Sequence, residues 1–151
     1  MQHDIATLAY MAGIIDGEGC IGINRRAHPN GSTYYRMHVR VTNTDRRLLD
    51  WIAERWGGSV SGPLRNDYGN ASGRCRAVYQ WQVSGDRAAA MLLGVRPFLV
   101  LKASQALLAV EFQSTVLVNA PGVVRDRVTP ELLDHRARLW ESMRNLNRKG
   151  K

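Results

Sequence analysis

The sequence has few of the residues that hold small secreted or zinc-binding proteins together. Only Cys20 and Cys75 are cysteines, and they are far apart, without the C-x-x-C spacing of a metal or redox site. The four histidines form no cluster that could act as a ligand set. These absences argue against a disulfide framework and against a zinc site, so we expect both cysteines to be free thiols.

Long apolar runs are also missing. None approaches the roughly 20 residues that a membrane span requires. The first residues, Met1–Asp4, lack the positive charge that opens a secretory signal. We therefore expect a soluble, intracellular protein without a membrane partner. The preference for arginine over lysine suggests a GC-rich genome, which leaves a bacterial, archaeal, phage or organellar host open.

Lysine is scarce, whereas arginine is abundant. Three lysines stand against eighteen arginines, and the formal net charge is +8. The arginines are spread from Arg25 to Arg148, which favours a basic face on a folded body over a charged tail. Such a face suits a polyanion such as nucleic acid. The 151 residues, 44% hydrophobic, suffice for one core and not for two, so we expect a single domain over residues 1–151.

Hydrophobic periodicity predicts helices separated by two hairpins. We expect helices, with their caps, over Asp4–Gly17, from Thr44 or Asp45 to Gly57–Gly58, and over 86–93, 97–116 and Thr129–Asn147. We expect strands over 20–27, 33–43, 59–65 and 74–84. The order α-β-β-α-β-β-α-α-α predicts an α+β protein with a four-stranded antiparallel sheet backed by helices.

The segment Met11–Gly19, MAGIIDGEG, resembles the nine-residue signature of LAGLIDADG homing endonucleases in order and spacing. The similarity continues through Val41-Thr42-Asn43, Arg46-Arg47 and Pro97–Lys102, and covers roughly residues 5–115. The signature departs from the family at three positions, with Met11 for leucine, Gly17 for alanine and Glu18 for aspartate. The last change keeps the carboxylate and lengthens its arm by one methylene.

This resemblance implies the LAGLIDADG fold, an αββαββα core whose sheet binds double-stranded DNA. It implies a site-specific endonuclease, associated with intron or intein mobility, that cuts both strands of a long, near-palindromic target. With one motif per chain, the active form would be a homodimer paired through the motif helix. Small residues four apart let two helices approach closely. The expected interface residues are Ala9, Ala12, Gly13, Asp16 and Gly17.

The resemblance also implies metal-dependent hydrolysis. Oxygen-liganded Mg²⁺ can activate a water and stabilise the leaving oxygen. By similarity to the family, the Glu18 carboxylate and the Gly17 carbonyl would bind the metal, whereas Asp16, the rival acid, matches a structural position. We expect Mg²⁺ as cofactor, Mn²⁺ as a substitute, and Ca²⁺ to support binding without cleavage.

Lys102 is the second candidate catalytic residue. It is the one internal lysine, and its compact ammonium can neutralise phosphate charge or position water. It also matches the family lysine after the Pro-Phe-Leu segment. Asn43 matches the polar residue that orients water, and Arg46 or Arg47 would reach a phosphate near the cut. A length difference before this pair leaves both arginines as candidates.

Side-chain alternation divides each hairpin into two faces. The inward set is Ile21, Ile23, Met37, Val39, Val41, Val60, Leu64, Cys75, Ala77, Tyr79 and Trp81. The expected DNA-binding residues are Asn24, Arg26, His28, Tyr34, Arg36, His38, Arg40, Ser61, Arg65, Arg74, Arg76, Gln80 and Gln82. Arginine, asparagine and glutamine suit the guanine and adenine edges in the major groove. A strand of about ten residues spans roughly 33 Å, about one turn of B-DNA per subunit.

Two alternatives use the same fold, and a third does not. An intron RNA maturase could apply the basic sheet to RNA, and a non-catalytic regulator could bind DNA without cutting it. The presence of both Glu18 and Lys102 favours cleavage over these. A plain structural or interaction protein would leave the nine-residue match as an accident.

Overall fold

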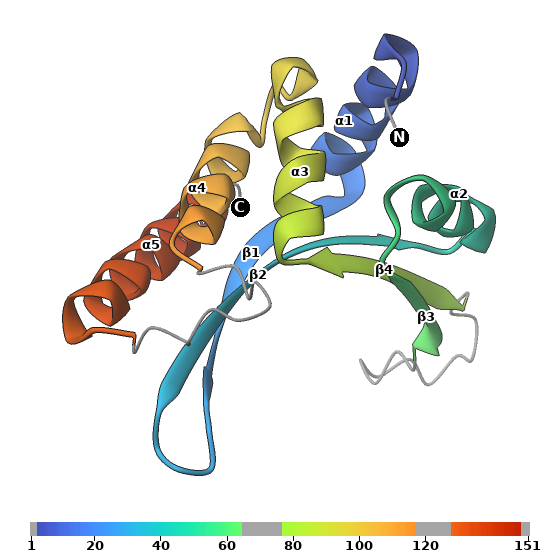
Figure 1. Ribbon diagram of the computed structural model, residues 1–151. Helices are drawn as coiled ribbons and strands as arrows, with labels where there is room; N and C mark the ends of the chain where they lie inside the picture. Colours follow the sequence, from blue (N-terminus) through green and yellow to red (C-terminus); the bar gives the residue numbers. More distant parts are fainter. Residues whose placement is uncertain (1–2, 65–76, 117–127, 149–151) are drawn as a thin grey trace, which may run out of the picture.

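The computed structural model describes residues 3–64, 77–116 and 128–148, in which helices cover one face of a twisted antiparallel sheet (Figure 1). The helices are α1 (Ile5–Glu18), α2 (Arg46–Trp56), α3 (Asp86–Val95), the short 3-10 helix η1 (Arg96–Phe98), α4 (Ala103–Ser114) and α5 (Pro130–Arg148). The strands are β1 (Gly19–Ala27), β2 (Thr33–Asn43), β3 (Ser59–Leu64) and β4 (Val78–Ser84). The predicted α+β class and four-stranded sheet are confirmed.

The two hairpins are offset along the sheet, whose strand order is β1-β2-β4-β3. All of β1 pairs with β2, but β4 pairs only with the second half of β2, from His38 opposite Ser84 to Asn43 opposite Tyr79. The first hairpin therefore runs beyond β4 at one end of the sheet (Figure 1). This offset lengthens the uncovered face of the sheet along the strand direction.

The core lies between the sheet and the helices. The predicted inward residues of the first hairpin, such as Ile21 and Val39, are buried. Leu49, Ile52 and Trp56 of α2 pack on the same side. Each fully buried side chain of this size stabilises the fold by roughly 1.5–3 kcal/mol.

Helix ends follow the predicted capping residues. Asp4 accepts a hydrogen bond from the backbone N–H of Thr7 at 2.7 Å, and Asp45 accepts one from Arg47 at 3.0 Å. Asp45, rather than Thr44, is therefore the N-cap of α2. Gly57 ends α2 with φ +68°, a left-handed backbone conformation that favours glycine.

Some expectations about the helices and strands were wrong. The helix expected over 97–116 begins only at Ala103, because the Asp16 carboxylate binds the backbone N–H groups that precede it. Leu64, expected inside, is 41% exposed, since the β3–β4 register shifts between Ser61 and Leu64. Ala77, also expected inside, is exposed just before β4. Cys75 lies outside the described residues.

Helix α5 covers the outer edge of β1. Its Leu139 and Met143 are buried, and Asn147 Nδ2 donates a hydrogen bond of 3.0 Å to the Ile21 carbonyl oxygen. The Trp140 ring lies 6.3 Å from the Tyr35 ring, centroid to centroid. The predicted helix start is confirmed, since the Thr129 hydroxyl accepts from the Leu132 N–H at 3.2 Å. None of the helices in the described ranges is both long and apolar enough to cross a membrane.

Candidate functional site

The end of α1 and residues 100–102 bind each other by reciprocal hydrogen bonds. The Asp16 carboxylate accepts from the backbone N–H groups of Val100, Leu101 and Lys102 at 2.7, 3.2 and 3.0 Å. In return, the Lys102 ammonium donates to the carbonyl oxygens of Ile15 at 2.8 Å and Asp16 at 2.6 Å. A cation is favourable there, because the last carbonyls of a helix lack intrahelical partners and carry partial negative charge. The ammonium is thereby fixed beside the last turn of α1.

Glu18 lies at the junction of α1 and β1. Its side chain is exposed, and no described residue donates a hydrogen bond to its carboxylate. The next residue, Gly19, permits the sharp turn into β1, since a Cβ there would lie 2.7 Å from the Ile15 carbonyl oxygen. Gly19 pairs with Val41, so Glu18 and Asn43 lie at the same end of the β1–β2 pair. The structure thus brings Glu18, Asn43 and Lys102 to one region.

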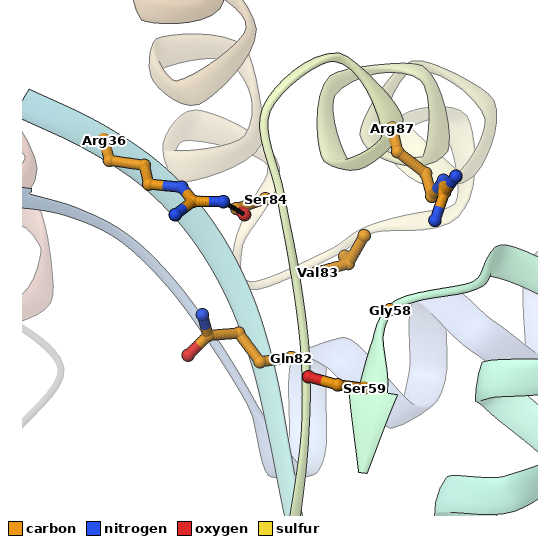
Figure 2. Close-up of a pocket in the computed structure, with 7 residues that line it drawn as sticks. All are labelled: Arg36, Gly58, Ser59, Gln82, Val83, Ser84 and Arg87. Carbon is orange, nitrogen blue, oxygen red and sulfur yellow. Dashed lines mark hydrogen bonds between the residues drawn. The ribbon is translucent and has the colours of Figure 1, made fainter.

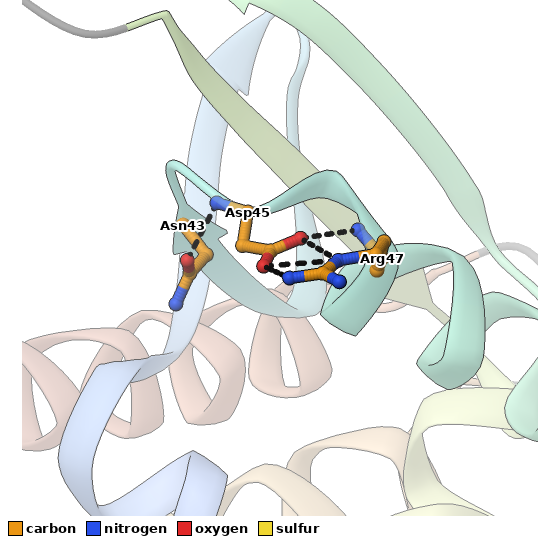
Figure 3. A network of polar contacts seen from close by, with 3 residues as sticks. All are labelled: Asn43, Asp45 and Arg47. Atoms are coloured by element: carbon orange, nitrogen blue, oxygen red, sulfur yellow. Dashed lines mark hydrogen bonds and ion pairs between the residues drawn. The ribbon is translucent and has the colours of Figure 1, made fainter.

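A polar network connects the end of β2 to the start of α2 (Figure 3). Asn43 Oδ1 accepts from the Asp45 N–H at 2.8 Å, so its amide NH₂ points away from this turn. The Arg47 guanidinium donates to the Asp45 carboxylate from Nε at 3.0 Å and from Nη2 at 2.5 Å. These hydrogen bonds from Arg47 lower the pKa of Asp45 to about 2.

Arg46 turns in another direction. Its Nε lies 3.3 Å from the Asp50 carboxylate oxygens, and its guanidinium carbon lies 6.0 Å from the centre of the Tyr79 ring. Tyr79, expected in the core, is half-buried opposite Asn43. The sequence reasoning therefore missed the neighbours of both candidate arginines. Only the i,i+4 spacing of Arg46 and Asp50 could have indicated one of them.

The uncovered face of the sheet carries paired polar side chains from β2 and β4. Arg40 Nε donates to Gln82 Oε1 at 2.8 Å, and Arg36 Nη2 donates to Ser84 Oγ at 2.7 Å. Because Arg40 uses Nε for this bond, its two terminal nitrogens point past Gln82 and can donate elsewhere. The structure thus pairs two predicted DNA-binding residues, Arg40 and Gln82, and it pairs Arg36 with Ser84, which was not predicted.

His38 shares this face but differs in accessibility. It is only 4% exposed, and its ring lies over Gly22, where an added Cβ would be 2.8 Å from imidazole Cε1. Burial, with a smaller contribution from the positive charge of Arg40, lowers the pKa of His38 to about 4. The expectation of an accessible His38 is wrong, because Gly22 provides a recess for the ring. The imidazole is neutral at neutral pH.

The remaining predicted DNA-binding residues divide into two groups. Near the tip of the first hairpin, Arg26, His28 and Tyr34 are exposed and Asn24 is half-buried. The rings of His28 and Tyr34 lie 4.5 Å apart. Ser61 is exposed on β3, and Gln80 Nε2 lies 3.5 Å from Thr42 Oγ1. Arg65, Arg74 and Arg76 lie outside the described residues.

One side of α1 is apolar and uncovered in the single chain. Ala9, Gly13 and Gly17 are exposed at intervals of four residues, and a Cβ added to either glycine would meet nothing within 4 Å. Val100 and Leu101, which follow η1, are 83% and 72% exposed. Ala12 was wrongly expected on this face, since its side chain is fully buried in the core. The partly exposed Asp16 is bound to the 100–102 backbone.

The described part of a single chain offers too few oxygen ligands for a divalent ion. Within the described ranges, no three His, Cys, Asp or Glu side chains gather as a metal group. The Glu18 carboxylate and the Gly17 carbonyl are hard oxygen donors, which fit Mg²⁺ or Ca²⁺, but these ions take about six or more ligands. Glu18 and Gly17 of one chain would therefore supply only part of the ligand set for such an ion. Cys20 is an exposed free thiol, as expected.

The fold and the arrangement of the sheet are those of the LAGLIDADG homing endonucleases. The chain is similar to the homing endonuclease I-CvuI in complex with its target, with a TM-score of 0.74 and 23% identity over 93% of this chain and 82% of that one. The archaeal intron-encoded I-Vdi141I bound to DNA gives 0.71 and 18%, over 93% and 84%.

The I-SmaMI LAGLIDADG homing endonuclease bound to cleaved DNA gives a TM-score of 0.64 and 13% identity, over 95% of this chain but only 46% of that one. No family model matches the chain, and no curated protein matches it. The similarity therefore lies in the fold.

Proposed function

We propose that this chain is one subunit of a homodimeric, site-specific DNA endonuclease that hydrolyses both strands of a long, near-palindromic target with the help of Mg²⁺. The observation that carries the proposal is the end of α1. There the carbonyl oxygens of Ile15 and Asp16 fix the Lys102 ammonium beside the last turn of the helix, and the exposed carboxylate of Glu18 belongs to the last residue of that helix. The similar solved structures, I-CvuI in complex with its target and I-Vdi141I complexed with DNA, support this proposal.

The metal would be held by Glu18 and the Gly17 carbonyl, with the equivalent groups of a second subunit. When bound, Mg²⁺ would activate water and stabilise the leaving oxygen. Lys102 would add positive charge beside the phosphate, and its two carbonyl bonds reduce the entropy lost in ordering the side chain. Asn43 would orient the water, because its NH₂ points away from the turn that its carbonyl oxygen holds.

The uncovered side of α1 supports pairing with a second copy. A helix that is apolar on all sides is normally buried, yet Ile5 at the start of α1 is 72% exposed. The exposed Val100 and Leu101 beside the end of α1 extend the apolar surface. The open space over Gly13 and Gly17 would let a second α1 pack closely. Pairing there would bring two copies of Glu18 together near a twofold axis.

The paired side chains on the sheet support DNA as the substrate. Bidentate donation to guanine O6 and N7 requires two nitrogens in fixed geometry. Gln82 holds Arg40 by Nε alone, which leaves such a pair available. The eleven residues of β2 span roughly 37 Å, about one turn of B-DNA. Two subunits would therefore follow about two turns.

The decisive experiment is selection of cleaved sites from a randomised duplex library with the purified protein and Mg²⁺. The proposal expects one ordered, near-palindromic site, cut in both strands. A protein that enriches a site but leaves it intact in Mg²⁺ and Mn²⁺ would instead be a DNA-binding regulator. Preferential binding of structured RNA over any duplex would favour a maturase.

A further inference from the structure

A polar cleft of about 480 Å³ lies at the outer edge of the sheet (Figure 2). Its wall contains Gly58 and five polar residues, namely Arg36, Ser59, Gln82, Ser84 and Arg87. The cleft exists because β3 begins at Ser59, opposite Gln82, whereas β4 continues to Ser84 and pairs there with β2 alone. The edge of the sheet is therefore notched at this point.

Two arginines from different elements contribute positive charge to this cleft. Ser84 Oγ accepts from Arg36 Nη2 at 2.7 Å, which fixes the Arg36 guanidinium at the rim. Arg87, in the first turn of α3, lies across Gly57, where an added Cβ would be 2.8 Å from Nη1. Neither arginine forms an ion pair within the described part of the chain.

Among the described residues, no acidic side chain lines the cleft. The nearby Asp86 carboxylate accepts a hydrogen bond of 2.8 Å from Gln113 Nε2, on the helix side of the sheet. Two guanidinium groups together with serine hydroxyls are donors that match a phosphate group. The chemistry of the cleft therefore selects an anion.

The position of the cleft indicates where that phosphate would come from. A four-stranded sheet is roughly 14 Å wide, from three strand spacings of about 4.8 Å, and the major groove is about 12 Å wide. If the uncovered face enters this groove, the edges of the sheet lie along the two phosphate backbones. Ser59 belongs to the edge strand β3, and Gln82 and Ser84 belong to its neighbour β4. Arg36 reaches the cleft from β2 through its hydrogen bond to Ser84.

We propose that this cleft binds a backbone phosphodiester of the DNA next to the base pairs that β2 and β4 contact. This inference rests on the proposed DNA-binding function. The phosphate fixes the register of the sheet in the groove, since phosphate contacts position a protein and base contacts specify the sequence. Arg87 contributes to affinity without altering base preference.

The test uses the full-length protein, its selected duplex and Ca²⁺. Each phosphate that the protein neutralises makes the fall of log K with log salt steeper by about 0.9. Arg87→Ala should therefore reduce the slope by roughly one unit per subunit, or about two for a homodimer, and leave the selected sequence unchanged. Ser59→Asp, at an exposed edge position that tolerates substitution, should weaken binding at least tenfold. Arg96→Ala removes an exposed arginine outside the cleft and should change neither the salt slope nor the DNA affinity.

A duplex series with single neutral methylphosphonates identifies the phosphate. A methylphosphonate at one position per half-site should weaken DNA binding by the unmodified protein and should not weaken binding by Arg87→Ala any further. Unchanged salt slopes for Arg87→Ala and unchanged affinity for Ser59→Asp, in protein that still binds and cuts its site, would overturn the cleft assignment alone. A shallower salt slope for Arg87→Ala, combined with no cleavage by the unmodified protein in Mg²⁺, would support phosphate binding in the cleft and contradict the proposed endonuclease activity.

Inorganic phosphate distinguishes a free anion from a DNA phosphate. It should shift the amide resonances of Ser59 and Ser84 only weakly, at millimolar concentrations. Tight phosphate binding, combined with DNA affinity that Arg87→Ala leaves intact, would assign the cleft to a free anion and overturn the backbone assignment.

Discussion

Lys102 donates its backbone N–H to the Asp16 carboxylate at 3.0 Å and its ammonium to the Asp16 carbonyl oxygen at 2.6 Å. The two residues therefore hold the end of α1 against the start of α4 from both directions. With three backbone N–H groups bound, the Asp16 carboxylate is committed to this junction. This commitment favours Glu18 over Asp16 as the metal-binding acid.

Replacing Lys102 by Met should slow cleavage of the selected duplex at least a hundredfold, because it removes positive charge beside the proposed scissile phosphate. Loss of the two carbonyl bonds should also lower the free energy of unfolding by about 1–3 kcal/mol. Single-turnover rates in Mg²⁺ and urea unfolding measure the two effects. Unlike Lys102→Met, Lys102→Arg keeps the positive charge, but it replaces the compact ammonium with a planar guanidinium. If Lys102→Met cuts at the normal rate, the residue is a helix cap only.

Glu18→Gln should abolish cleavage and leave DNA affinity in Ca²⁺ within a few fold of the unmodified protein. The amide keeps the length and most of the hydrogen bonding of the side chain, but loses the charge that binds metal. Cleavage in Mg²⁺ and binding in Ca²⁺ are measured on the same duplex. Glu54→Gln on α2 is the matched control at an exposed glutamate. Normal cutting by Glu18→Gln would refute the metal assignment.

Gly13→Leu should convert the homodimer into a monomer. A Cβ at Gly13 meets nothing within the chain, so the subunit should stay folded while the larger side chain separates the two helices. Analytical ultracentrifugation at micromolar concentration measures the change. Ser142→Leu, exposed on α5, should leave the dimer intact. A monomeric unmodified protein, even with DNA present, would contradict the expected assembly.

Arg40→Ala should relax the base preference at one position in each half-site and leave the rest of the selected site unchanged. The discrimination against a wrong base at that position should fall by about 1–3 kcal/mol per guanine contact. Gln82→Leu should have a weaker effect at the same position, because it removes the acceptor that orients Arg40 Nε. Site selection with each variant measures both. Identical profiles for all three proteins would show that another surface contacts the bases.

Acid should destabilise the protein through His38. Burial lowers the pKa of His38 from about 6.5 to about 4, so between these pH values the unfolded chain binds a proton that the folded chain does not. The free energy of unfolding should therefore fall as the pH drops from 6.5 to 4, by about 2 kcal/mol after allowance for solvent screening, and this loss should stop below about 4. Urea unfolding at pH 7 and 4.5 measures it. His38→Gln should lack this component, and an equal fall in both proteins would contradict it.

Much of the fold follows from local patterns in the sequence. Alternation assigned both faces of the first hairpin correctly, and Asp4 and Asp45 were recognised as helix caps. The failures depend on contacts between distant residues. The helix expected from Pro97 is delayed by Asp16, 84 residues before Val100, because its carboxylate binds backbone N–H groups outside a helix. No pattern within 97–116 encodes that contact.

The candidate site was only partly predictable, for a related reason. The motif identified Glu18, and composition identified Lys102, but neither indicated that the ammonium would bind the carbonyls of Ile15 and Asp16. The alternation of side chains along a strand predicts the face of the sheet on which a residue lies, but it does not predict whether solvent can reach that residue. His38 is on the expected side, yet it is buried because its cross-strand neighbour is Gly22.

The hydrogen bond from Asn147 to the Ile21 carbonyl has a consequence for handling the protein. An uncovered edge strand can pair with the edge of another molecule, which is a common route to aggregation. Helix α5 blocks that route along β1, where Asn147 occupies a main-chain acceptor and Trp140 covers the neighbouring side chains. A chain shortened before Pro130 should therefore precipitate at concentrations at which the full-length protein stays in solution.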